Sequence, residues 1–133
     1  MNTTPTLKAP EQLVSEAKGD VLTCTPREAV ARIRQDDPIA IVDVRGSAEY
    51  AEAHLDTALN IPRGLLEWKI IGALPEATAP ILIHCGTGGR AVLSARSLMA
   101  MGYTNVAAID GSFSEITECM AENQALTRTE FTE

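Results

Sequence analysis

Short apolar runs alternate along the chain with segments in which hydrophobic residues recur at helical spacing. Apolar runs of about four to eight residues, bounded by turn-forming residues, predict β-strands. The run from Ile39 to Val44 is interrupted only by Asp43, which is typical of a strand buried on both faces. We therefore expect strands at residues 21–24, 39–44, 59–62, 81–84 and 105–109.

The segments between these strands carry helix signals. Thr25-Pro26-Arg27-Glu28 combines a capping residue, a proline at the first helical position and a capping-box glutamate. Gly102 follows the last residue of another amphipathic segment and predicts the end of that helix. We expect helices at about residues 26–34, 47–52, 64–70 and 90–101, and a last helix that begins near Phe113.

Alternating strands and helices, with connections too long for hairpins, predict an α/β fold. Specifically, we expect a doubly wound, mainly parallel five-stranded sheet with helices on both faces. We expect residues 1–20 to form a lead-in with weak helical character that caps the domain and residues 21–124 to form the domain. Residues 125–133 form a polar tail, which we expect to be frayed from Thr127 onward. Ligands of such sheets bind beyond the carboxyl ends of the strands, which is where Cys85 falls.

The net charge limits the classes of partner that we expect, and the cysteine content bears on disulfides and metal sites. The 133-residue chain has a formal net charge of −7, whereas nucleic acids and anionic membranes require a basic surface, so we expect small molecules or proteins as partners. The N-terminus lacks the features of a signal peptide and no apolar run reaches membrane-spanning length, so we expect a cytoplasmic location. Cys24, Cys85 and Cys119 are odd in number and lack Cys-x-x-Cys spacing, so we expect neither a disulfide framework nor a metal site.

Cys85 lies where an apolar strand turns into a helix, and glycines are concentrated in the residues after it. A lone cysteine at such a place is more often an inert core residue, but glycine enrichment indicates that something approaches the backbone closely. Backbone N–H groups of such a loop can point at the sulfur, and an arginine adds a permanent positive charge. The loop therefore predicts an anion cradle around a nucleophilic thiolate, made of Cys85, Gly86, Thr87, Gly88, Gly89 and Arg90.

This cradle predicts nucleophilic catalysis without a general base. The N–H groups that stabilise the thiolate also stabilise an anionic substrate, so we expect the sulfur to attack an anion and form a covalent intermediate. His84 precedes Cys85, but side chains alternate along an extended strand and its ring points away from the sulfur. We therefore expect His84 to be a packing residue.

The loop from Cys85 to Arg90 occurs together with several other motifs along the chain, namely Asp43-Val44-Arg45, Glu49-Tyr50, His54-Leu55, Ala58-Leu59-Asn60-Ile61-Pro62, Gly102-Tyr103, Asn105-Val106 and Asp110-Gly111. In these residues the sequence resembles the rhodanese-like sulfurtransferases. The resemblance implies that Cys85 accepts a sulfane sulfur from a small anionic donor, of the thiosulfate or mercaptopyruvate type, becomes a persulfide, and passes the sulfur to cyanide or to a thiol, including a thiol on a protein. It implies no metal or organic cofactor.

Loop length separates this interpretation from related activities. Phosphatases and arsenate reductases that resemble this family have one more residue between cysteine and arginine, whereas four residues separate Cys85 from Arg90. A phosphatase or arsenate reductase is therefore the weaker alternative, and a non-catalytic module that binds a partner or senses redox state is another. Gly86 replaces a cationic residue of many thiosulfate-using members, and Cys-Gly-Thr-Gly resembles mercaptopyruvate-using members, so the donor stays open.

Each remaining candidate for a pocket residue could instead have a purely structural role. Arg45 is a candidate pocket residue, but an ion pair with Asp43 that holds neighbouring loops is the favoured interpretation. Arg63 either adds positive charge at the pocket mouth or is an exposed arginine. Trp68 either forms a pocket wall or, on an apolar stripe with Leu65 and Ile71, belongs to the core. Positions 53, 57 and 112 lack the glycines that are common in the family, which affects the scaffold rather than the chemistry.

Overall fold

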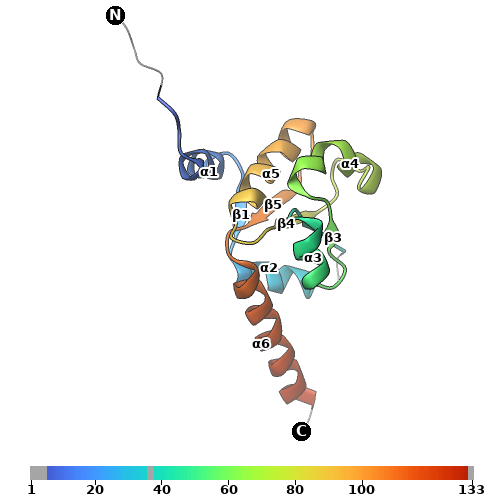
Figure 1. Ribbon diagram of the computed structural model, residues 1–133. Helices are drawn as coiled ribbons and strands as arrows, with labels where there is room; N and C mark the ends of the chain where they lie inside the picture. The colour runs from blue at the N-terminus through green and yellow to red at the C-terminus, as the bar shows by residue number, and fades with distance from the viewer. Residues whose placement is uncertain (1–5, 36–37, 132–133) are drawn as a thin grey trace, which may run out of the picture.

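The computed structural model describes residues 6–35 and 38–131, and its centre is a five-stranded sheet (Figure 1). The strand order is β1-β5-β4-β2-β3, and each neighbouring pair is parallel. The parallel α/β sheet predicted from the sequence is therefore confirmed. Its strands are β1 (Leu22–Cys24), β2 (Ala40–Asp43), β3 (Leu59–Asn60), β4 (Ile81–His84) and β5 (Val106–Ile109).

Helices cover both faces of the sheet, as the sequence predicted. On one face, buried residues of three helices share a hydrophobic cluster with the strands, and these helices are α1 (Pro10–Lys18), α4 (Leu66–Ala73) and α5 (Gly89–Met101). On the other face, α2 (Pro26–Ile33), α3 (Ser47–Glu52) and α6 (Phe113–Phe131) contribute to a second cluster. A short 3₁₀ turn, Arg63–Leu65, precedes α4.

The predicted caps are present at α2 and α5. The Thr25 hydroxyl accepts a hydrogen bond from the Glu28 N–H at 3.1 Å, and the Glu28 carboxylate accepts one from the Thr25 N–H at 2.9 Å. At the other end of the fold, Gly102 has a φ of 112° and terminates α5 in the left-handed region. Glycine enters this region without the steric cost that a Cβ imposes, so this sequence signal marked the end of the helix correctly.

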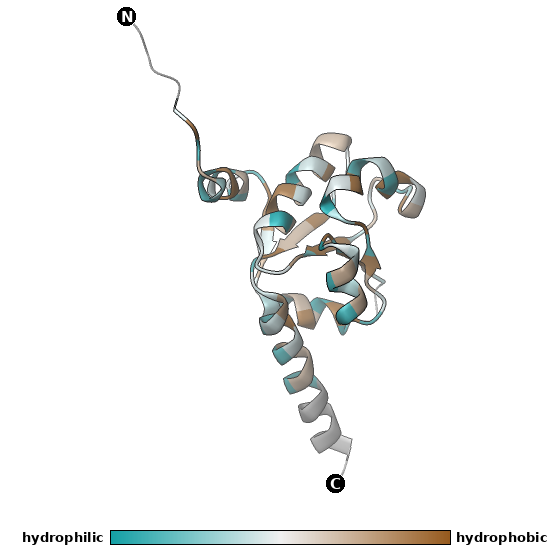
Figure 2. Ribbon diagram, in the orientation of Figure 1, coloured by the Kyte–Doolittle hydropathy of each residue, from teal (hydrophilic) through white to brown (hydrophobic). Residues whose placement is uncertain are grey.

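The sheet is buried from both sides. Every residue of β4 and β5 is buried, and Figure 2 shows these hydrophobic strands enclosed by helices of mixed hydropathy. Ile81 and Ile83 face the cluster under α5, whereas Leu82 faces the cluster under α2 and α6. This burial on both faces explains the continuous apolar runs and gives the loops at the carboxyl ends of the strands a rigid support.

Several element boundaries differ from the sequence prediction, most of them by one or two residues. β3 ends at Asn60, two residues early, because Pro62 has no N–H to donate to a neighbouring strand. α6 continues to Phe131, and neither glycine nor proline interrupts the chain after residue 112. Residues 1–5 of the lead-in and residues 132–133 of the tail lie outside the described residues.

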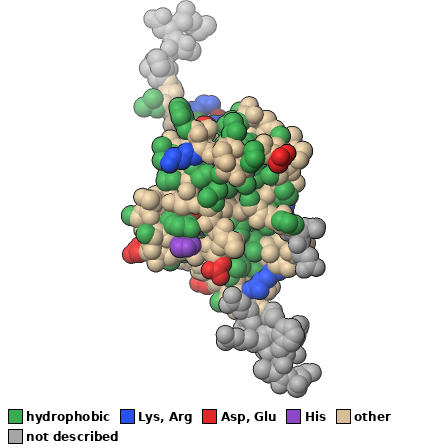
Figure 3. Space-filling model, turned by 90° about the vertical axis from the view of Figure 1, so that its right-hand side faces the viewer, with side chains coloured by type: hydrophobic (Ala, Val, Ile, Leu, Met, Phe, Trp, Pro, Cys, Tyr) green, Lys and Arg blue, Asp and Glu red, His purple; other side chains and the backbone are tan. Residues whose placement is uncertain are grey.

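Trp68 is exposed, so the interpretation of this residue as core is wrong. The inner side of α4 carries Leu66 and Ile70, which are four residues apart and fully buried. Trp68 lies between them in sequence and therefore on the opposite side of the helix. It is 84% exposed there, and Leu65 and Ile71 are exposed as well. Figure 3 views the side of the molecule on which α4 lies and shows hydrophobic side chains gathered on its upper half.

Candidate active site

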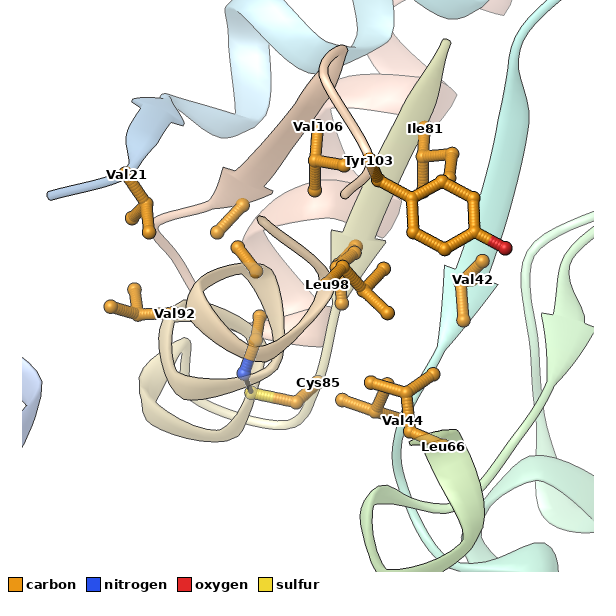
Figure 4. Packing of buried hydrophobic residues seen from close by; sticks show 14 of the residues in the cluster. Val21, Val42, Val44, Leu66, Ile81, Cys85, Val92, Leu98, Tyr103 and Val106 are labelled. Atoms are coloured by element: carbon orange, nitrogen blue, oxygen red, sulfur yellow. Dashed lines mark hydrogen bonds between the residues drawn. The ribbon is translucent and has the colours of Figure 1, made fainter. Parts of the chain in front are cut away.

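Cys85 begins the loop that joins β4 to α5, at the carboxyl end of the central strand. Its Sγ accepts hydrogen bonds from the N–H groups of Gly88 at 3.0 Å and Ala91 at 3.4 Å. The side chain is fully buried and lies between the start of α5 and the apolar residues of β2 and α4 (Figure 4). Backbone N–H donors that converge on one sulfur stabilise a thiolate. Gly88 belongs to the loop for which the sequence predicted such a cradle, whereas Ala91 lies one residue beyond that loop and was not predicted as a donor.

Gly88 has the backbone conformation that this cradle requires. Its φ is 114°, and an added Cβ would lie 3.3 Å from the backbone nitrogen of Gly111. An L-residue there would be strained and crowded, so only glycine lets the loop curl under the sulfur with its N–H directed inward. The glycine pattern of the sequence thus has a geometric cause at this position.

Arg90 pairs with Glu49 beside the loop. The two side chains form hydrogen bonds of 3.0 Å and 3.2 Å, and an added Cβ on Gly86 would lie 3.1 Å from the Arg90 guanidinium. Hydrogen bonds from Arg90 and from the Gly46 N–H lower the pKa of Glu49 to about 2, and the same contact raises the pKa of Arg90. The carboxylate that holds Arg90 at the loop comes from α3. The sequence marked Glu49 only as one of the residues that carry the family resemblance and gave it no role at the loop.

Arg45 is held by Asp43 rather than directed into a pocket. Its guanidinium donates hydrogen bonds to Asp43 at 3.0 Å and 2.8 Å and to the Ala53 carbonyl at 2.7 Å, and it lies 4.1 Å above the Phe113 ring. Both charged side chains are buried. The structural interpretation of this pair is confirmed, and these bonds join β2 to the end of α3.

Arg63 lies at the carboxyl end of β3 and is partly buried. Its guanidinium donates two hydrogen bonds to the Glu67 carboxylate, at 3.1 Å and 2.9 Å, and one to the Ser97 hydroxyl at 3.0 Å. These contacts connect α4 with α5. Arg63 is therefore not a freely exposed arginine, and its place at the pocket mouth stays a prediction.

His84 has the environment of a packing residue. Its ring is fully buried, stacks on Phe113 with a centroid separation of 5.8 Å, and has Nε2 at 3.6 Å from the Asp43 carboxylate. Burial lowers the pKa of His84 and favours the neutral ring, although the nearby Asp43 charge opposes this effect. Phe113 belongs to the cluster on the face of the sheet opposite to that of Cys85, as expected from alternation along β4.

A groove of about 470 Å³ adjoins the loop on the side of α1. Thr87 and Gly89 form its loop wall, and α1 forms the facing wall with residues that include Val14 and Lys18. No sequence signal linked α1 to the loop, because the two segments are far apart along the chain. Within residues 6–35 and 38–123, no cluster of histidine, cysteine and acidic side chains has the arrangement of a metal site, and no helix in the described part of the chain is long and apolar enough to cross a membrane.

The buried Cys85, the backbone N–H groups around its Sγ and the doubly wound sheet agree with the family that the sequence resembles. The model of the rhodanese-like domain matches residues 25–119, and the chain belongs to this family. The match spans β2 to β5 and the whole Cys85 loop, but it leaves out α1 and β1.

Named relatives include sulfurtransferases. Thiosulfate sulfurtransferase PspE of Escherichia coli (strain K12) is 31% identical over 65 residues, which cover 49% of this chain and 62% of PspE. Thiosulfate sulfurtransferase GlpE of Pseudomonas putida (strain GB-1) is 27% identical over 88 residues, which cover 66% of this chain and 78% of GlpE. The family of this chain therefore includes thiosulfate sulfurtransferases.

Solved structures share the fold. RPA3614 of Rhodopseudomonas palustris CGA009, described as a protein of unknown function and possible tyrosine phosphatase, has a TM-score of 0.76 and 25% identity, and the match covers 89% of this chain and 95% of RPA3614. The homodimeric polysulfide-sulfur transferase of Wolinella succinogenes has a TM-score of 0.67 and 22% identity, with 81% of each chain covered. The second likeness concerns the fold alone.

Proposed function

We propose that the protein is a sulfurtransferase in which Cys85 carries the sulfur as a persulfide. The observation that carries this proposal is the Cys85 Sγ in a cradle of backbone N–H groups, in a loop closed by Arg90, which four intervening residues separate from Cys85. Such a cradle stabilises a thiolate before transfer and a persulfide anion after it, because both carry their charge on sulfur.

In the first half-reaction the Cys85 thiolate attacks the outer sulfur of the donor. With thiosulfate, the new S–S bond forms as the sulfur–sulfur bond of the donor breaks, and sulfite leaves with the electron pair. With mercaptopyruvate, the carbon–sulfur bond breaks and pyruvate leaves after the thiol proton moves to its carbon. Arg90 binds the anionic donor once the donor competes with Glu49 for the guanidinium.

In the second half-reaction an acceptor takes the outer sulfur. Cyanide or a thiolate attacks that sulfur, the S–S bond to Cys85 breaks, and the electron pair returns to Sγ as a thiolate. Thiocyanate or a new persulfide leaves, and the N–H groups of Gly88 and Ala91 again hold the free thiolate. The cycle needs no metal or organic cofactor, and a cytoplasmic location remains part of this prediction.

Two alternatives make different predictions. The possible phosphatase activity in the description of RPA3614 would require a cradle wide enough for a tetrahedral oxyanion, whereas the shorter loop here favours a smaller one. A non-catalytic binding module has no need of a cysteine in an amide cradle, and a redox-sensing module would oxidise its thiol without passing on a sulfur atom. Both alternatives predict that no sulfur is transferred.

The intact mass of the reduced protein after incubation with thiosulfate, and separately with mercaptopyruvate, tests the proposal. We expect Cys85 to gain one sulfur atom and cyanide to remove it. Cys85→Ser should gain none, because a hydroxyl at this position is not ionised at neutral pH, and its circular dichroism spectrum should match that of the wild type. Hydrolysis of a phosphate ester without any sulfur gain would overturn the proposal in favour of an oxyanion enzyme.

A further inference from the structure

The outer side of α4 carries a ridge of exposed apolar side chains. Trp68 and Ile71 are three residues apart and therefore neighbours on the helix surface, and Leu65 precedes them at the same spacing. Their exposed fractions are 84%, 58% and 44%, respectively. Figure 3 shows hydrophobic side chains gathered on this side of the molecule. Single exposed apolar residues are ordinary, but a contiguous ridge with a tryptophan at its centre is typical of a protein interface.

A groove adjoins the ridge at the carboxyl end of α4. Its volume is about 220 Å³, and it is lined by Ile71, Pro75, Ala77, Met101, Gly102 and Tyr103. The Tyr103 hydroxyl donates a hydrogen bond of 2.6 Å to the Leu74 carbonyl, which connects the end of α4 with the segment after α5. Because the other side chains of this lining are apolar, the groove fits an apolar side chain of a partner.

The ridge and the groove are placed so that two copies of the chain complement each other. An α-helix rises 1.5 Å per residue, so Trp68 lies about 4.5 Å before Ile71 along α4. If two α4 helices pack antiparallel about a two-fold axis at Ile71, the Trp68 of the second copy lies about 4.5 Å beyond Ile71. α4 ends at Ala73, so this Trp68 falls past the helix end, where Pro75 and Ala77 line the groove.

The exposed area is what a weak two-fold dimer needs. Trp68 alone presents roughly 200 Å² of apolar surface. With Leu65, Ile71 and the groove, the exposed apolar surface reaches about 500 Å² per copy, which is near the upper end for a typical monomer. A two-fold contact buries this surface on both copies, about 1,000 Å² in total, and this is the lower limit for a specific interface.

We infer that the protein forms a two-fold homodimer in which Trp68 of each copy inserts into the groove of the other. The inference goes beyond the proposed function and does not depend on it, because Cys85 is not part of this surface. The inner side of α4 packs with Leu66 and Ile70 in the same cluster as Cys85, so the dimer braces from outside a helix that supports the site. Interfaces of this size bind weakly, and we expect a dissociation constant of about 10 µM.

Trp68 reports on this contact directly, because it is the only tryptophan of the chain. As the concentration of the full chain passes through the dissociation constant, the emission maximum should move to shorter wavelength as the ring leaves water. The mass from analytical ultracentrifugation should double over the same range. Each copy carries a net charge of −7, so added salt should strengthen the dimer by screening the repulsion between the copies.

Two variants locate the interface. Trp68→Glu should raise the dissociation constant about thirtyfold or more, as loss of a central aromatic anchor does, and its circular dichroism spectrum should match that of the wild type because the side chain is exposed. Leu22→Glu is the matched control, since Leu22 is 69% exposed on β1 at the other edge of the sheet from β3. This control makes the same change of charge and should leave the dissociation constant within about twofold of the wild type.

A cross-link tests the position of the two-fold axis. A residue at the axis meets its own copy, so Ile71→Cys should form a disulfide-linked dimer on oxidation in air, well above the level of the wild type with its native cysteines. A wild-type chain that stays monomeric at about 100 µM, tenfold above the expected dissociation constant, would overturn the inference in favour of a different partner. Equal effects of Trp68→Glu and Leu22→Glu, or no cross-link through Ile71→Cys, would also overturn it, because the contact would lie elsewhere. None of these results depends on a sulfur gain at Cys85, so failure of this inference is distinguishable from failure of the proposed function.

Discussion

At the scale of single residues, the pair of Glu49 and Arg90 sets the charge that an incoming anion meets. Both side chains are partly exposed, with 42% of the Arg90 side chain and 44% of the Glu49 side chain accessible. Exposed pairs of this kind contribute only about 0–1 kcal/mol. Under the proposed function, we expect a donor anion to displace the Glu49 carboxylate at modest cost, so that Glu49 competes with the donor for the guanidinium.

Glu49→Gln should consequently lower the KM of thiosulfate by about two- to fivefold, since up to about 1 kcal/mol of competition is removed. The pKa of Glu49 is lowered to about 2, so its charge is constant above pH 5 and the effect should be the same at pH 5 and pH 8. Steady-state kinetics at both pH values measure it. Glu52→Gln makes the same charge change on the same helix, and an equal shift of KM in this control would contradict the prediction.

At the scale of elements, the turn between α3 and β3 contains a strained residue. Thr57 has a φ of 66°, a region that L-residues enter at a cost of about 1–2 kcal/mol. The sequence has threonine where the rhodanese-like family commonly has glycine, and the structure shows that this departure falls on backbone that favours glycine. The strain is part of the scaffold and lies outside the Cys85 loop.

Thr57→Gly should raise the free energy of unfolding by about 1 kcal/mol, because relief of the strained φ exceeds the added entropy of the unfolded chain. Urea unfolding followed by circular dichroism measures the change. Gly102→Ala provides the reciprocal test: Gly102 has a φ of 112° and open space around an added Cβ, so alanine should destabilise by backbone strain alone. Destabilisation by Thr57→Gly would show that its side chain contributes more than the strain costs.

The sequence predicted elements better than it predicted contacts between elements. Apolar runs and caps are local, so they located the strands, the start of α2 and the end of α5. The glycine-rich loop likewise placed Cys85 at the carboxyl end of β4. The partner of Arg90 lies 41 residues away, and the exposure of Trp68 depends on which side of α4 meets the sheet. Tertiary packing determines both, and local patterns do not carry that information.

At the scale of the whole molecule, the carboxyl ends of neighbouring parallel strands bring separate loops together. Asp43 ends β2, His84 ends β4, and these two residues are register partners. The buried Asp43 and Arg45 side chains join the end of β2 to α3, while Asn60 donates hydrogen bonds to the carbonyls of Asp43 and Arg45 at 3.0 Å. The loop of Cys85 is therefore supported by a buried polar network on the neighbouring strand.

Asp43→Asn separates a structural role of this network from a role in donor binding. The variant leaves the Arg45 guanidinium buried without its carboxylate, so we expect a loss of about 3–5 kcal/mol in the free energy of unfolding. Arg27→Gln, which breaks an exposed pair with Glu122, should cost about 0–1 kcal/mol. Urea unfolding gives both values, and kinetics on the folded fraction give the KM of thiosulfate.

Because Arg45 points at Asp43 and Phe113 rather than at the sulfur, the KM of thiosulfate should change less than twofold in Asp43→Asn. A large rise in KM with little loss of stability would instead place Arg45 in the donor site.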